Sequence, residues 1–236
     1  MSIRRIRNCV LVVKENLVCI KNLRFYITPY LYNNKARTMA EEQPKIELTI
    51  KGGWEGELLG NRVIIWDSKA IELYDESGYG KPQPEENPDR LELDIVEAAY
   101  LAEKEKLKVF VKGEKKRKFL EFKDLMGVGI KNVNLFHPSF IVFRDLRDRG
   151  YLCKTAFKFG AVFRVYERGV KLKRGPKAPH EHTKFVVQPV AEESAFSLPE
   201  MSRAVRLAHN IRATFVWAVI DKDNDCTYYE IKRLTP

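Results

Sequence analysis

Tyr166 and His182 flank a basic segment of the 236-residue chain, and their side chains are its best candidates for proton transfer. Fifteen residues separate them, and seven Lys or Arg lie between positions 164 and 184. Metal-free RNA cleavage needs a base for the 2′-hydroxyl, an acid for the 5′-oxygen and a cation for the phosphorane. Histidine suits the acid, and a tyrosine suits the base if cations lower its pKa from about 10. Composition alone favours a plainer interpretation, in which Tyr166 packs in the core and the loop is solvated.

The other histidines offer little support for a metal site. His180 and His182 would share one face of a strand, which is compatible with metal binding, but no third ligand stands at a usable spacing. His137 precedes Pro138 and indicates a helix boundary, whereas His209 falls on a mostly apolar helix stripe and is expected to pack. We therefore predict neither a metal ion nor a cofactor.

The net charge of +10 is distributed unevenly along the chain. Residues 1–38 hold eight Lys or Arg against one Glu, a net charge of +7, and residues 39–100 hold six against fifteen acids, a net of −9. Residues 101–236 carry +12, so a polyanion partner is expected to bind the C-terminal half. From Met39 onward the net charge is only +3.

Composition excludes several classes of protein. With 44% hydrophobic residues and a mean hydropathy of −0.36, the chain is neither disordered nor a membrane protein, and no apolar run approaches about 20 residues. Its four cysteines form no close CxxC pair, which argues against a disulfide scaffold and a zinc ribbon. A reducing, cytoplasmic location is the expectation.

Periodicity and turn residues predict alternating strands and helices. In the first half we expect strands at 46–50, 62–66 and 108–111, helices at 68–74, 91–106, 122–126 and 140–149, a loop at 78–89 and a basic turn at 112–118. In the second half we expect strands at 151–157, 162–166, 182–190, 214–220 and 226–231, a basic loop at 167–181, and a helix at 197–211 capped by Ser197 with Glu200. Residues 1–38 read as a loosely attached extension, or Met39 is the true start.

Several segments in order resemble the archaeal tRNA-splicing endonuclease family. In the second half these are RDRGYLCKTAFKFGAVFRVYERG (147–169), EHTKFVV (181–187), MSRAVRLAHNIR (201–212) and FVWAVIDKDNDCTYYEIKR (215–233). In the first half they are GELLGNRVIIWD, ELYDESGYGKP and LELDIVEAAYLAEKEKLKV. The resemblance covers roughly residues 54–236 and omits the first 38.

The resemblance implies an α+β fold of two small mixed α/β domains, the second a mixed sheet flanked by helices. They would span residues 39–135 and 136–236, after the extension at 1–38. It also implies a tRNA-intron lyase that cuts precursor tRNA at both junctions of a bulge–helix–bulge without metal. The products would carry a 2′,3′-cyclic phosphate and a 5′-hydroxyl.

The resemblance also assigns site residues. Tyr166 falls on the family's general base and His182 on its general acid, whereas Ala213 occupies the position of the family's catalytic Lys. Arg206, and less surely Arg233, fall on arginines that contact bulge bases. The long basic loop resembles an insertion whose lysines contact substrate, with Lys171 and Lys177 among the candidates, together with Lys173 and Arg174.

Alanine cannot stabilise a phosphorane, so the absent Lys leaves three alternatives. Arg212, Lys171 or Lys177 replaces it, the change inactivates the chain, or the chain is a weakly active or silent RNA-binding and scaffolding subunit. Retention of both Tyr166 and His182 argues against a purely structural subunit. A DNA nuclease of related fold would need a carboxylate cluster, which the sequence lacks.

The resemblance implies an oligomer as well. An acidic loop of one subunit would insert into a basic cleft of the next, and Asp221, Asp223 and Asp225 match that loop. A homodimer, a homotetramer or a heterotetramer with a structural subunit would all fit, without a membrane partner. A polar hairpin turn is the plainer alternative for these residues.

Overall fold

A computed structural model describes residues 4–6, 9–14, 17–20, 23–29, 52–83, 90–113, 116–155, 162–172, 182–195 and 197–233. The chain divides into two compact units. Unit 1 comprises Met1–Pro44, Ala156–Val165 and Thr183–Pro236, and unit 2 comprises Lys45–Thr155 and Tyr166–His182. Each holds a mixed sheet with helices, and the fold is α+β as predicted.

Unit 1 is built on strands that follow one another in the hydrogen-bonded order β1-β2-β3-β4-β15-β14-β13-β12. Their bounds are β1 Arg4–Ile6, β2 Cys9–Lys14, β3 Leu17–Ile20, β4 Leu23–Pro29, β12 Phe163–Tyr166, β13 Phe185–Ala191, β14 Thr214–Ile220 and β15 Cys226–Arg233. Strands β13 and β14 run parallel, and the other neighbouring pairs are antiparallel.

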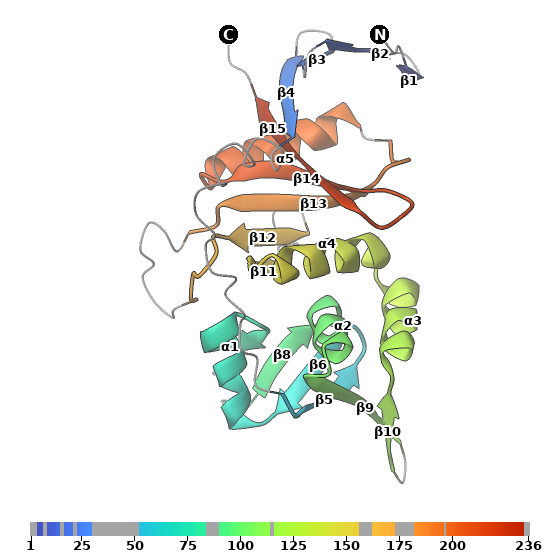
Figure 1. Cartoon of the computed structure of the whole chain (residues 1–236), viewed down its shortest axis with the longest axis vertical. Coiled ribbons are helices and arrows are strands. Elements are labelled where there is room, and N and C mark those ends of the chain that lie inside the picture. The colour runs from blue at the N-terminus through green and yellow to red at the C-terminus, as the bar shows by residue number, and fades with distance from the viewer. Residues whose placement is uncertain are drawn as a thin grey trace. The chain divides into compact units, whose positions relative to one another are not determined.

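Helix α5 (Leu198–Asn210) covers one face of this sheet at β14 and β15 (Figure 1). The Ser197 side chain accepts a hydrogen bond from the Glu200 amide, so the helix begins at the predicted cap. Its buried residues Met201, Val205 and Ala208 pack against Phe215 and Ile231. The structure confirms the predicted helix 197–211 and the hairpin that follows it. The prediction succeeded because the cap, the apolar stripe and the turn residues all indicate these elements.

Unit 2 contains a six-stranded sheet in the order β10-β9-β5-β6-β8-β7. Its strands are β5 Trp54–Leu59, β6 Arg62–Trp66, β7 Lys81–Pro82, β8 Arg90–Asp94, β9 Leu107–Lys112 and β10 Arg117–Leu120. The unit also includes η2 Ser68–Ala70, α1 Ile71–Ser77, α2 Ile95–Glu103, α3 Phe122–Asn132, α4 Phe136–Asp148 and β11 Leu152–Thr155. No helix of the described residues is long and apolar enough to span a membrane.

The predicted helix 91–106 is wrong at its start. Residues Arg90–Asp94 form β8, which pairs with β6 so that Leu91 lies opposite Ile65 and Leu93 opposite Val63. Asp94 then caps α2 through the Val96 amide, with Glu97 completing a capping box. The apolar residues of the strand continue the helical stripe of α2, so periodicity alone does not separate the two elements.

The predicted break between two short helices also lies elsewhere. Helix α3 continues through Gly127 and Gly129 to Asn132, and α4 begins at Phe136 with Pro138 in its first turn, where proline is tolerated. Gly129 is needed for packing, since a Cβ there would lie 2.3 Å from the Phe136 ring. The predicted strand at 46–50 lies outside the described residues, and the predicted boundary at residue 135 lies within unit 2.

Gly129→Ala should lower the free energy of unfolding by about 1–3 kcal/mol, because the added methyl group meets the buried ring of Phe136. Gly127→Ala is the matched control in the same helix. A Cβ at that position meets nothing within 4 Å, so this variant should gain up to about 1 kcal/mol of helix stability. Urea denaturation of both variants measures the difference, and equal effects would contradict the packing argument.

Asp94 should make stability depend on pH in a narrow range. Desolvation raises the pKa of Asp94 to about 6, with a further contribution from the Glu97 charge. Between its unfolded pKa of about 4 and this value the folded state binds more protons, so this contribution to stability falls as the pH rises. Asp94→Asn keeps an acceptor for the Val96 amide but removes the titration. Unfolding of both proteins between pH 4 and 7 should show that this fall is present only with Asp94.

Candidate active site

Three strand ends meet at one edge of the unit 1 sheet. Val165 of β12 pairs with Phe185 of β13, and Phe185 pairs with Thr214 of β14. The Lys184 amide donates to the Val165 carbonyl at 2.9 Å, and the Thr214 amide donates to the Lys184 carbonyl at 2.9 Å. Because β12 runs antiparallel to β13 while β14 runs parallel to it, the end of β12 lies beside the starts of β13 and β14.

Val165, Phe185 and Thr214 form a row of paired strand ends, and the three expected catalytic positions lie close to this row in the sequence. Tyr166 directly follows Val165, His182 precedes Lys184 by two residues, and Ala213 directly precedes Thr214. His182 lies in the bend before β13 with an exposed side chain, whereas Ala213 is partly buried. Each position is therefore at most three residues along the chain from a member of this row.

The side chain of Tyr166 is buried, with 1% of the residue exposed. It packs in a cluster with Leu152 and Leu172, against which Tyr74 and Val170 also pack. A general base has to come within about 3 Å of the proton that it removes. For Tyr166 to act as a base, this enclosure would therefore have to open.

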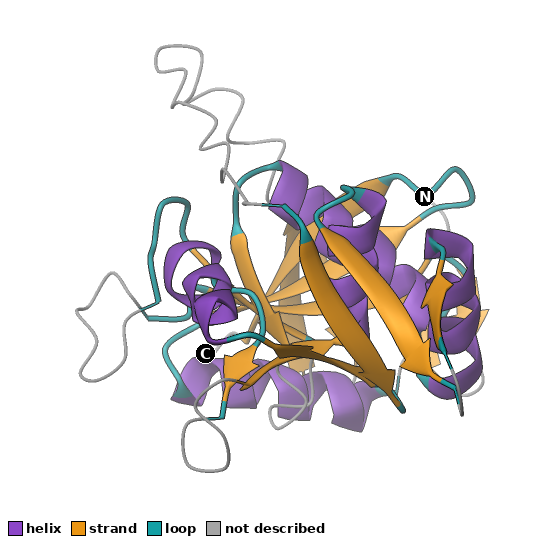
Figure 2. Cartoon of the chain, turned by 90° about the horizontal axis from the view of Figure 1, so that it is seen from below, coloured by secondary structure: helices purple, strands orange, loops and turns teal. Residues whose placement is uncertain are grey.

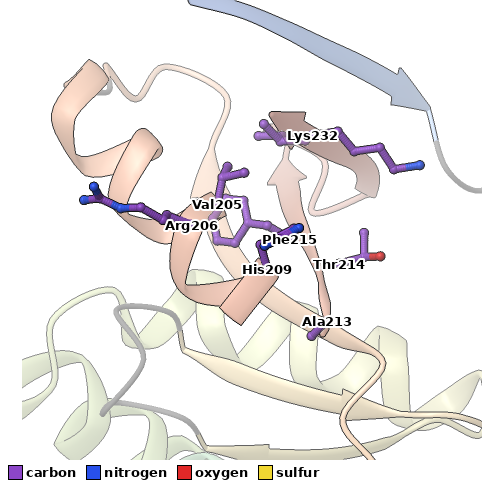
Figure 3. A pocket seen from close by; sticks show the side chains of 8 residues that line it. Val205, Arg206, His209, Ala213, Thr214, Phe215 and Lys232 are labelled. Carbon is purple, nitrogen blue, oxygen red and sulfur yellow. The ribbon is translucent and has the colours of Figure 1, made fainter. Parts of the chain in front are cut away.

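A pocket of about 340 Å³ lies beside Ala213, between α5 and the strands β14 and β15 (Figure 3). Its lining residues are Val205, Arg206, His209, Ala213, Thr214, Phe215, Ile231 and Lys232. The apolar lining comes from Val205 of α5, Ala213, Phe215 of β14 and Ile231 of β15, and the nitrogen groups come from Arg206, His209 and Lys232. The pocket therefore combines an apolar base with nitrogen donors suited to anions and nucleobases.

His209 and Lys232 are the residues that sequence reasoning missed. His209 was expected to pack, but it is exposed and lines the pocket, since it follows the buried Ala208 by one residue on α5. Lys232 lies on β15 next to the buried Ile231, and its amine is 2.8 Å from Glu230. Strand alternation in the peptide Glu230–Arg233 was the only sequence signal for Lys232.

Two of the other expected contact residues are exposed, and the side chains of two more lie outside the described residues. Arg206 is exposed on α5 and extends away from Ala213 (Figure 3), and Lys171 is exposed as well. Arg233 ends β15, but its side chain lies outside the described residues, as does all of Lys177. The described residues include no group of three metal-ligating side chains, and His180 lies outside them.

The acidic turn between β14 and β15 is exposed. A side-chain oxygen of Asp221 accepts hydrogen bonds from the amides of Asp223 and Asp225, both at 2.9 Å. Asn224 adopts a left-handed conformation with φ of 64°. Asp221 therefore shapes the turn, while the carboxylates of Asp223 and Asp225 remain exposed to solvent.

Comparison with known proteins matches two family models to the chain. Residues 136–228 match the tRNA intron endonuclease catalytic C-terminal domain, and residues 54–123 match the tRNA intron endonuclease N-terminal domain. The chain is 38% identical over 179 residues to a tRNA-splicing endonuclease of Thermococcus onnurineus, covering 75% of this chain and 95% of that protein.

Two further relatives carry the same name. The protein of Pyrococcus furiosus is 39% identical over 176 residues, which is 74% of this chain and 93% of that protein. The protein of Methanothermobacter thermautotrophicus is 36% identical over 185 residues, which is 77% of this chain and 98% of that protein. With both domains matched in order and nearly the whole length of these relatives covered, the chain belongs to the tRNA intron endonuclease family.

Proposed function

We propose that this chain is an endoribonuclease that excises introns from precursor tRNA by metal-independent cleavage at bulge–helix–bulge junctions. Its relatives are tRNA-splicing endonucleases, which supports an endonuclease acting in tRNA splicing. The observation that carries the proposal is the row Val165–Phe185–Thr214, from which positions 166, 182 and 213 are each at most three residues away.

In the proposed reaction Tyr166 removes the proton from the 2′-hydroxyl at the cleavage site. The resulting oxygen attacks the adjacent phosphorus, and the bond to the 5′-oxygen breaks as His182 donates a proton to it. The products are a 2′,3′-cyclic phosphate and a 5′-hydroxyl. Arg206 and Arg233 would hold the bulge bases, and Lys171 and Lys177 would contact phosphates.

The charge on the phosphorane needs a cation, which Ala213 does not provide. The adjacent Arg212 is exposed, and Lys171 and Lys177 belong to the basic segment after Tyr166. Lys232 joins these candidates because it lines the pocket that contains Ala213, although its side chain extends away from Ala213 in Figure 3. Each of these four residues is a candidate to supply the missing charge.

Ala213 also favours a second candidate function, a silent subunit that binds RNA for an active partner. Such a subunit would use Arg206 and the basic residues without cleaving. For either function we propose an oligomer in which the exposed Asp223 and Asp225 contact a basic surface of another subunit. Mass measurement in solution, with and without a co-expressed partner, separates a homomeric from a heteromeric assembly.

Purified protein in EDTA should cleave a precursor tRNA with a bulge–helix–bulge and leave cyclic-phosphate ends. His182→Ala should slow single-turnover cleavage about 10²- to 10⁴-fold without loss of RNA binding, because it removes the acid. His137→Ala is the control, because it removes an exposed histidine at the start of α4 that lies outside the proposed site. Tight binding without any cleavage would support the silent subunit instead.

Ala213→Lys should raise the single-turnover rate about 10²- to 10³-fold by restoring the electrostatic contact. Ala213→Met is the matched control, since it adds a chain of similar length without charge. A rate that rises equally in both variants would indicate a packing effect. An unchanged rate in Ala213→Lys would show that another cation already serves or that position 213 is misplaced.

A further inference from the structure

The six-stranded sheet of unit 2 has two chemically different faces. Strand register places Glu57 beside Ile64 and Phe110, and Phe110 beside Phe119, so these side chains share one face. Val63 and Val109, one position along, lie on the opposite face, where α2 packs and the core is dry. We refer to the face that carries Glu57, Trp66 and Phe119 as the open face, and its strands lie toward the viewer in Figure 2, with helices behind them.

Two large aromatic side chains are presented on the open face. Trp66 is 49% exposed and Phe119 is 50% exposed. Both are held from beneath, since the Trp66 indole donates to the Glu57 carboxylate at 3.0 Å and the Phe119 ring packs edge-on against Phe110 at 5.9 Å. They are therefore preorganised, exposed aromatic surfaces of the kind on which RNA-binding sheets stack unpaired bases.

The charges on this face are layered. Glu57 and Glu92 are buried, with 4% and 8% of each residue exposed. Above them, Lys112 contacts Glu57 at 3.0 Å and Arg62 contacts Glu92, while the side chains of these cations are 65% and 62% exposed. The hydrogen bond from Lys112 keeps the pKa of Glu57 below its usual value although burial opposes this, so the acid stays ionised and anchors the cation.

The solvent therefore meets mainly positive charge. Arg117 is 57% exposed and contacts Glu55, an exposed acid of this face, at 3.2 Å. Lys108 and Lys81 lie on the same face by register and are exposed as well. A surface with several exposed cations around aromatic rings is complementary to a polyanion, whereas the core of a protein–protein interface is depleted of charge.

The two rings are far enough apart to contact different nucleotides of one RNA strand. Strands β10 and β6 are separated by β9 and β5, so three strand spacings of about 4.8 Å place Phe119 about 14 Å from Ile64, which lies in the same cross-strand row. Trp66 lies two residues further along β6. An RNA strand that contacts both rings would pass over Lys112 or Arg117 on the way.

We propose that the open face binds a single-stranded segment of RNA, with bases stacked on Trp66 and Phe119 and phosphates paired with Arg62, Lys112 and Arg117. This proposal rests on the proposed function only for the identity of the RNA, which would then be the precursor tRNA. Single-stranded rather than duplex RNA is specified because stacking on a side chain needs an unpaired base.

The test uses the full chain and a fluorescent 12-nucleotide single-stranded RNA of mixed sequence, with binding followed by anisotropy. Trp66→Ala and Phe119→Ala should each raise the Kd roughly 5- to 150-fold, as expected for one lost stack. Ile130→Ala is the control, because Ile130 is 58% exposed on α3, away from this face, and its Kd should not change. Arg117→Gln should weaken binding and reduce the slope of log Kd against log salt concentration by about one.

A pair of variants at one position separates stacking from general apolar contact. Phe119→Tyr keeps an aromatic face and should retain binding, whereas Phe119→Leu keeps apolar area without the ring and should lose it. Equal binding by both, or native Kd values for Trp66→Ala and Phe119→Ala, would overturn the proposal. The proposal would also be overturned if sedimentation showed that the variants lose self-association while their RNA binding is unchanged, since the face would then be a protein interface.

Cleavage is scored separately, so the two proposals fail in different ways. Loss of oligonucleotide binding in the Trp66 and Phe119 variants supports the open face even if no precursor tRNA is cut. If cleavage depends on His182 but these variants bind the oligonucleotide normally, the proposal for the open face is wrong and the proposed function stands.

Discussion

Arg147 carries a buried positive charge that backbone carbonyls have to satisfy. Its guanidinium donates to the carbonyls of Ser77 at 2.9 Å and Cys153 at 3.0 Å and lies 4.0 Å from the centroid of the Tyr79 ring. A buried cation without such partners would cost several kcal/mol, so α4, the end of α1 and β11 are required to meet around it. Lys154 adds a second, partly buried cation to the same place, donating to the Gly78 carbonyl at 2.7 Å. The constraint joins the two matched domains, because Ser77 belongs to the first and Arg147 to the second.

The position of Tyr166 follows from this constraint. Strand β11 is held by Cys153 and Lys154, and its first residue, Leu152, packs directly against Tyr166. Gly78 allows that approach, since its φ of 67° and its missing side chain leave room where a Cβ would lie 2.7 Å from Leu152. The candidate base thus rests on residues from both matched domains. Its burial is the consequence of this packing, and movement of the cluster is the step that substrate binding would have to drive.

Sequence reasoning located the parts whose local signals agree. The cap at Ser197, the stripe of α5 and the hairpin after it all indicated the same element, and the motif order indicated the family. It misjudged β8, where a buried strand runs into a helix without a change in apolar pattern, and α3, where Gly129 serves close packing rather than a break. The burial of Tyr166 agrees with the plainer interpretation from composition, but its packing partners could not be predicted, because they include residues about 90 positions away, such as Tyr74. The row of strand ends follows from parallel and antiparallel pairing, which no short motif encodes.

Strand register shows which surface is basic in more detail than the charge summed along the chain. Residues 39–100 carry a net charge of −9, which directs attention to the C-terminal half for any polyanion. That sum counts Glu57 and Glu92 fully, although both are buried beneath cations whose own charges face the solvent. Exposed acids such as Glu72 and Glu76 lie instead on α1. The field that a ligand meets depends on which charges are exposed on one face. On the open face, Lys108, Lys112 and Arg117 of the basic segment 101–236 lie beside Arg62 and Lys81 of the acidic segment 39–100.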